Sequence, residues 1–76
     1  MREVLEYLAK SLVSDPDAVE ITEVTNGSAI NLRLTVAPED MGKIIGKGGR
    51  TVRAIRDVVR AAATKSGVIV TVEIVE

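Results

Sequence analysis

Four glycines stand within eight residues in the stretch MGKIIGKGGRTVRAI, which covers residues 41–55. Apolar residues with helical spacing stand on both sides of the last three glycines. Because glycine accepts positive φ and lets another backbone approach closely, a tight helix-loop-helix turn is predicted at residues 46–49. One or two glycines suffice for such a turn, so three glycines with a lysine among them indicate a further role.

Two long amphipathic helices are predicted, over residues 2–13 and from about Gly49 to Lys65. Pro16 follows the first helix, and a Ser-Gly pair ends the second. The second helix is predicted to have an apolar face and a basic face on opposite sides. The apolar face consists of Val52, Ile55, Val58, Val59 and Ala62, and the basic face consists of Arg53, Arg56 and Arg60, with Arg50 at its margin.

A β-hairpin is predicted around Asn26-Gly27, because both residues accept the positive φ of a type I′ turn. With these two residues as the loop, Ile21 would face Leu32. The same register would place a charged side chain among apolar ones, so a bulge is expected at residues 22–23. A third strand is predicted over residues 68–75, where apolar and polar side chains alternate.

A short helix is predicted between the hairpin and the glycines, in APEDMGKII. Pro38 suits the first helical position, and Glu39 and Asp40 suit the positive end of the helix dipole. Adjacent carboxylates can also act in acid–base catalysis, but the capping role is favoured here. The predicted order is α-β-β-α-α-β, an α+β fold with helices packed on one face of a three-stranded sheet, in one domain over residues 1–76.

Composition argues against most enzyme classes. The chain has no cysteine and no histidine, which removes disulfides, thiolate zinc sites and every catalytic triad built on imidazole. No catalytic residue, metal site or cofactor is therefore predicted. No apolar run approaches the roughly 20 residues that span a bilayer, and the first residues lack a signal-peptide pattern. A cytoplasmic protein without a membrane partner is expected.

Charge is distributed unevenly, although the formal net charge is only −1. Residues 43–65 carry seven basic side chains and one acidic side chain, whereas the rest of the chain has three basic and ten acidic residues. A solvated helix face would explain why these residues are charged, but not why nearly all have the same sign. The basic segment contains the glycine-rich loop, so a polyanionic partner is predicted.

Two common nucleotide-binding loops do not match this spacing. A Walker A loop has four residues between its glycines and a hydroxyl after its lysine. Here three residues separate Gly42 from Gly46, and Gly48 follows Lys47. A Rossmann fingerprint would need a third glycine at Thr51 and a preceding strand. The loop is instead predicted to bind phosphate electrostatically, through exposed N–H groups and the positive end of the next helix.

The stretch IIGKGGRTVRAI, residues 44–55, resembles the signature of the KH domain. That signature is a G-x-x-G loop between two helices, with an aliphatic pair before it. Aliphatic residues follow three and six positions after the last glycine, here Val52 and Ile55, and for Ile55 a core position is favoured. The predicted element order is that of the type II KH fold, so the resemblance covers essentially the whole chain.

The resemblance implies that about four nucleotides of single-stranded RNA lie in a groove, with their backbone clamped by loop 46–49. Ile44, Ile45 and Val52 would line its apolar floor, although each can equally be a core residue. A strand edge over residues 30–36 would form the other wall. Such a groove could also accept single-stranded DNA, and the sequence does not decide between the two.

Ten residues are implied to bind RNA. They are Lys43, Ile44, Ile45, Gly46, Lys47, Gly48, Gly49, Arg50, Val52 and Arg53. Farther along the basic face, Arg56 and Arg60 either extend the footprint or only solvate the helix.

The resemblance also implies a role and partners. Small bacterial KH proteins act as RNA chaperones or post-transcriptional regulators, form homodimers, and pair with a larger Jag/KhpB-like RNA-binding protein in cell elongation and division. The alternative is a dimerisation or adaptor module whose RNA affinity is incidental. Ile69 and Val75, on the sheet face opposite the predicted core, are either interface residues or ordinary exposed ones.

Overall fold

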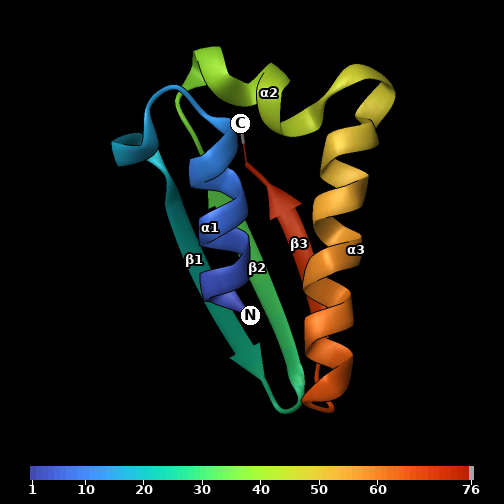
Figure 1. The fold of residues 1–76 in the computed structure, drawn as a ribbon. Helices are drawn as coiled ribbons and strands as arrows, with labels where there is room; N and C mark the ends of the chain where they lie inside the picture. Colours follow the sequence, from blue (N-terminus) through green and yellow to red (C-terminus); the bar gives the residue numbers. More distant parts are fainter. Residues whose placement is uncertain (76) are drawn as a thin grey trace.

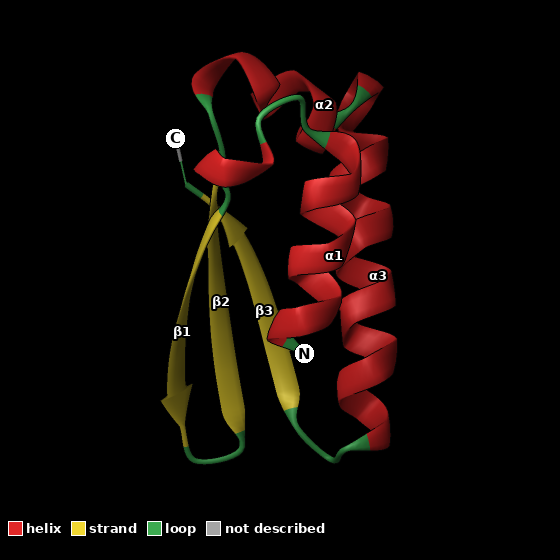
Figure 2. Ribbon diagram, turned by 60° about the vertical axis from the view of Figure 1, so that its left-hand side comes forward, coloured by secondary structure: helices red, strands yellow, loops and turns green. Residues whose placement is uncertain are grey.

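A computed structural model describes residues 1–75 as two layers, a three-stranded sheet with helices on one of its faces (Figures 1 and 2). No helix within these residues is long and apolar enough to cross a membrane. The order α-β-β-α-α-β is confirmed. The elements are α1 (Arg2–Leu12), β1 (Glu20–Asn26), β2 (Ala29–Thr35), α2 (Met41–Ile45), α3 (Arg50–Lys65) and β3 (Ile69–Ile74), with 3-10 turns η1 (Pro16–Ala18), η2 (Pro38–Asp40) and η3 (Lys47–Gly49).

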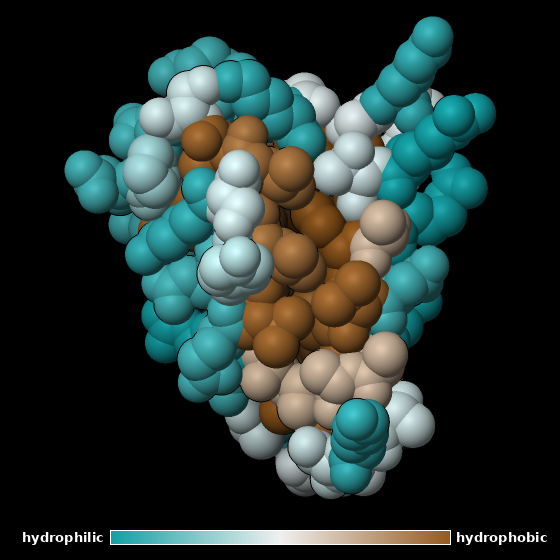
Figure 3. All heavy atoms as spheres, in the orientation of Figure 1, coloured by the Kyte–Doolittle hydropathy of each residue, from teal (hydrophilic) through white to brown (hydrophobic). Residues whose placement is uncertain are grey.

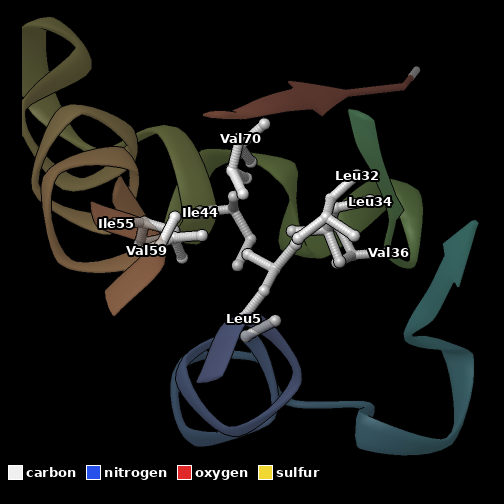
Figure 4. Close-up of a cluster of buried hydrophobic side chains, with 11 residues drawn as sticks. Leu5, Leu32, Leu34, Val36, Ile44, Ile55, Val59 and Val70 are labelled. Carbon is white, nitrogen blue, oxygen red and sulfur yellow. The ribbon is translucent and has the colours of Figure 1, made fainter. Parts of the chain in front are cut away.

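An aliphatic core fills the space between the two layers. Figure 4 shows Leu5 of α1, Ile44 of α2 and Val59 of α3 converging on side chains from the sheet. Burying such side chains contributes about 1.5–3 kcal/mol each. The core comprises Leu5, Ala9, Leu32, Leu34, Val36, Ile44, Ile55, Val59, Ala63, Val70 and Val72.

Strand β2 is the central strand of the sheet. It pairs antiparallel with β1 and parallel with β3, in the order β1-β2-β3. A parallel pair requires a long crossover, which α2 and α3 supply. The predicted groove wall at residues 30–36 is therefore wrong, because both edges of β2 are paired. The free edge beside α3 belongs to β3 (Figure 1).

The β-hairpin forms one residue later than predicted. Asn26 pairs with Ala29, so the two loop residues are Gly27 and Ser28. Only Gly27 has a positive φ, 64°, as in a type II′ turn. The predicted bulge at residues 22–23 is absent from the pairing, which runs without interruption through β1. Glu23 lies opposite Leu32 in the observed register, but its side chain is exposed on the edge strand, so regular pairing does not bury its charge and no bulge is needed.

Helix α3 has a narrower buried stripe than predicted. Val52, Ile55 and Val59 are buried as expected, but Val58 is 49% exposed. The fourth buried position is Ala63, one residue beyond the predicted Ala62. The stripe follows the line along which α3 contacts the sheet, and Val58 lies to one side of that line, toward α1.

Candidate nucleic-acid interface

The turn between α2 and α3 requires glycine at position 46. Gly46 has φ 75° and ψ 172°, a conformation essentially restricted to glycine. A Cβ atom there would overlap Thr51 Oγ1 and lie only 2.6 Å from Thr51 Cβ and 2.9 Å from its backbone nitrogen. The close approach of these two residues brings the end of α2 against the first turn of α3.

Gly48 and Gly49 form the outer part of the loop, and both are left-handed, with φ 65° and φ 78°. A Cβ atom at Gly48 would have no neighbour within 4 Å, so that side of the loop is open to an approaching ligand. Gly49 is the N-cap of α3, and its N–H donates to Gly46 O at 3.1 Å. Both glycines are needed for the backbone path rather than for packing.

Positive charge surrounds this loop. Lys47 and Arg50 are exposed at the N-terminus of α3, where none of the described side chains caps the helix. The first N–H groups of a 16-residue helix and its dipole therefore add to the positive potential. Arg53, one turn into α3, reaches back so that its Nη2 donates to Gly48 O at 3.2 Å. The arrangement suits a phosphate group at the loop.

Lys43 is directed away from the loop. Its Nζ lies 3.5 Å from Asp40 Oδ1 and donates to Ser14 Oγ. The structure thus places Lys43 at the junction between α1 and α2, where its charge is partly neutralised. It is the one basic side chain among the ten predicted RNA-binding residues that forms an ion pair within residues 1–75.

Asp40 has a different role from the predicted one. It is 1% exposed, and its carboxylate accepts hydrogen bonds of 3.1 Å from the backbone N–H groups of Ser14 and Asp15. It makes no side-chain cap to α2. The Ser14 hydrogen bond lowers the pKa of Asp40 most, burial opposes this effect, and Asp15 and Lys43 lower the pKa further. Asp40 joins two distant segments, and no local sequence pattern marks that role.

The predicted apolar floor divides between core and surface. Ile44 is fully buried and points into the core (Figure 4), so it is not at a ligand-accessible surface. Val52 is 9% exposed and Ile55 is 4% exposed. Ile45 is 38% exposed and remains available beside the loop. Of the two isoleucines, only Ile45 therefore lies at the surface near the loop. The residues there with it are Lys47, Gly48, Gly49 and the arginines of α3, whereas Ile44 belongs to the core.

An apolar groove between α1 and α3 was not predicted. It has a volume of about 190 Å³ and appears as the brown area between these helices in Figure 3. Counted at about 100° per residue, the groove residues and the basic residues lie on opposite flanks of α3. Val58 and Leu12 would have indicated this groove from the sequence only if the buried residues of α3 had already been known. The groove is lined by Leu8, Leu12, Thr51, Ala54, Ile55 and Val58.

The two predicted interface residues have different surroundings. Ile69 alternates with buried residues along β3, so its 71% exposed side chain points away from the core, to the face of the sheet that no helix covers (Figure 2). Val75 is half-buried and lines an apolar pocket with Val36, Pro38 and Met41. They do not form one patch. Within residues 1–75 no cluster of acidic side chains is arranged to hold a metal ion.

Known proteins resemble this chain in sequence and in fold. The sequence model of the KhpA/KhpB KH domain matches residues 2–74. The chain is 56% identical over 75 residues to the RNA-binding protein KhpA of Clostridium acetobutylicum, covering 99% of this chain and 100% of that protein. It is 46% identical over 76 residues to the RNA-binding protein KhpA of Chlamydia trachomatis, covering 100% of this chain and 97% of that protein.

A solved structure supports the fold alone. The crystal structure of Aquifex aeolicus Era bound to GDP.AlF4- superimposes with a TM-score of 0.66 at 19% identity. The match covers 95% of this chain but 28% of that one. The α-β-β-α-α-β order, the three-stranded sheet and the glycine-rich turn are those of a type II KH fold. With the family match over residues 2–74, they establish that this chain belongs to the KhpA/KhpB KH-domain family.

Proposed function

We propose that this chain is a non-enzymatic single-stranded RNA-binding protein, one KH domain over residues 1–76, that clamps the RNA backbone with loop 46–49. The observation that carries the proposal is the open, left-handed Gly48-Gly49 backbone at the uncapped N-terminus of α3, with Lys47 and Arg50 exposed beside it. Backbone donors and side-chain charge of this kind at a helix N-terminus favour the binding of a phosphate group.

The names of the similar proteins support the ligand class, since they are called RNA-binding proteins. The arrangement of α3 and β3 supports a path for the bound RNA that runs from the loop along α3. Arg53 contacts the loop at Gly48 O, and Arg56, farther along α3, contacts Val72 O at the free edge of β3. In the proposed complex the RNA backbone follows the loop, and the bases face the gap between α3 and β3. Ile45 contacts the RNA beside the loop.

The test is a fluorescence-anisotropy titration of short single-stranded RNAs with Lys47→Asp/Gly48→Asp at several salt concentrations. Aspartate tolerates the left-handed conformation, and the space around Gly48 is open, so this variant is expected to fold. Lys10→Asp/Ser11→Asp on the exposed side of α1 changes the net charge by the same amount and serves as the control. Circular dichroism checks the folding of all three proteins.

The wild type and the α1 control are expected to bind with a log-log salt slope of roughly −0.7 per phosphate neutralised. The loop variant is expected to lose at least about tenfold in affinity, because each of its changes removes or opposes a phosphate contact. Equal binding by the two variants would place the site elsewhere. No binding by the wild type would overturn the proposal.

A second proposed function is pairing with another protein, either a second copy of this chain or a larger Jag/KhpB-like RNA-binding protein. The apolar groove between α1 and α3 favours it, since Val58 and Leu12 are exposed there without a covering element. Linking two KH domains would also raise the avidity for RNA. On the basis of the family resemblance, we propose that the chain is an RNA chaperone or post-transcriptional regulator that acts with a Jag/KhpB-like partner in the control of cell elongation and division.

Analytical ultracentrifugation of the wild type and of Val58→Asp tests this pairing. Val24→Asp is the matched control, because Val24 is 53% exposed on the uncovered face of the sheet. Loss of association only in the Val58 variant would support pairing through the groove. A monomeric wild type that also fails to bind a Jag/KhpB-like protein would exclude it.

A further inference from the structure

Arg56 holds a distinct position among the arginines of α3. Its side chain is half-buried, whereas Arg53 and Arg60 on the same flank are exposed. Its Nε donates to Val72 O of β3 at 3.1 Å. Arg56 therefore bridges α3 and the edge of the sheet, two turns from the start of the helix, instead of extending into solvent.

The contact is possible because β3 is an edge strand. Ile69 N–H donates to Ser28 O and Val75 N–H donates to Leu34 O, so the odd-numbered residues hydrogen-bond with β2. The even-numbered residues accordingly present their backbone groups to the free edge. Val72 O is one of these groups. Arg56 is thus fixed to the strand by its Nε alone.

The rest of the guanidinium group has no hydrogen-bond partner among residues 1–75. A guanidinium has five N–H donors in a planar fork, and the Val72 contact uses one of them. Arg56 makes no ion pair with any residue that the structure describes. The terminal nitrogens remain as a pair of donors with a fixed orientation, at the place where the proposed RNA groove would hold bases.

We propose that Arg56 is a specificity-determining residue that reads a base with two adjacent acceptors, guanine through O6 and N7 or cytosine through O2 and N3. This inference rests on the proposed function. Adenine and uracil place a donor beside each acceptor on these edges, so a donor fork cannot pair with both positions. A phosphate also accepts a bidentate arginine, but Lys47, Arg50 and the α3 N-terminus already supply charge at the loop, and Arg56 is withdrawn from it.

The test uses four fluorescent RNA octamers, all-uridine or with one central cytidine, guanosine or adenosine. Arg56→Lys keeps the charge but removes the fork, and Arg60→Lys makes the same change at an exposed position one turn farther on. The wild type and Arg60→Lys are expected to bind the cytidine and guanosine octamers about five- to tenfold more tightly than the other two. In Arg56→Lys this preference should fall below about twofold, with the salt slope unchanged.

Three results would overturn the inference. Arg56→Lys could keep the preference, it could weaken binding of all four octamers equally, as the loss of a bidentate phosphate contact would, or the wild type could bind all four equally. Absence of any wild-type binding would instead overturn the proposed function, and this inference with it. A check that needs no variant is the NMR signal of Arg56 Nε–H, which should shift more with the cytidine or guanosine octamer than with the adenosine octamer.

Discussion

The carboxylate of Asp40, just before α2, accepts a hydrogen bond of 3.1 Å from the backbone N–H of Ser14, just after α1. The same carboxylate accepts a second bond of 3.1 Å from Asp15 N–H. One buried side chain therefore ties the connection after α1 to the element that leads into loop 46–49. This link requires a carboxylate at position 40, because each of its two oxygens accepts a hydrogen bond from one backbone N–H.

Asp40→Asn is expected to lower the melting temperature at pH 7 by roughly 5–10 °C, since the amide NH2 would face a backbone donor. The folded-state pKa of Asp40 lies below its ordinary value of 3.8. The stabilisation is therefore fully present above that value and is lost as the pH falls through the folded pKa. Thermal unfolding from pH 2 to pH 7 should show a shallower acid dependence in the variant. Glu39→Gln, an exposed neighbour, is the control, and equal pH profiles for wild type and Asp40→Asn would contradict this prediction.

Gly46 and Gly48 should respond differently to alanine. Gly46→Ala combines a strained backbone with overlap on Thr51, so a loss of about 3 kcal/mol or more in the free energy of unfolding is expected. Gly48→Ala introduces only the left-handed strain of about 1–2 kcal/mol, because the space around it is open. Urea unfolding measures both values. Equal losses would mean that the contact between Gly46 and Thr51 does not shape the turn.

Val58 and Val59 are adjacent in sequence but differ in burial. Val59 is fully buried, so Val59→Ala should cost about 1–3 kcal/mol of unfolding free energy through lost burial and a cavity. Val58→Ala should cost less than about 0.5 kcal/mol in the monomer, because Val58 is half-exposed. Chemical unfolding at low protein concentration separates the two. A loss at Val58 as large as the loss at Val59 would favour the apolar face predicted from the sequence, in which both valines are buried.

The hairpin offers a comparison of the two turn assignments. Gly27→Ala should lower the unfolding free energy by about 1 kcal/mol, because Gly27 has a positive φ. Asn26→Thr should be neutral or slightly stabilising, since Asn26 is the last residue of β1 and threonine favours strands. In a type I′ turn centred on Asn26-Gly27, the Asn26 change would instead be clearly destabilising. Denaturant midpoints of the two variants decide between the turns.

Local patterns were sufficient to predict the element order and the glycine turn. Apolar periodicity marks the two long helices and the strands β2 and β3, and Gly46, Gly48 and Gly49 have the positive φ values expected of a tight glycine turn. The hairpin register was less certain from sequence because Gly27 can occupy either central position. The observed register moves the partner of Ile21 from Leu32 to Leu34, a shift of two residues that keeps Ile21 on the core face.

Contacts between distant segments could not be predicted in the same way. Asp40 resembles a helix-capping residue until its distance to Ser14 is known. Arg56 has the spacing of a solvent-facing arginine, and only the pairing of β3 with β2, which makes β3 the edge strand beside α3, gives it Val72 O as a partner. The burial of Ile44 and the exposure of Val58 likewise depend on where α1 packs, which the periodicity of α2 or α3 does not specify.

The opposite flanks of α3 have one further consequence. The flank of α3 toward α1 is apolar and uncharged, and the flank toward β3 is cationic, with the body of the helix between them. A protein docked on the first side would leave the second side uncovered. If both proposed partners bind, the helix would therefore serve as a two-sided scaffold, on which a nucleic-acid strand and a protein contact different atoms.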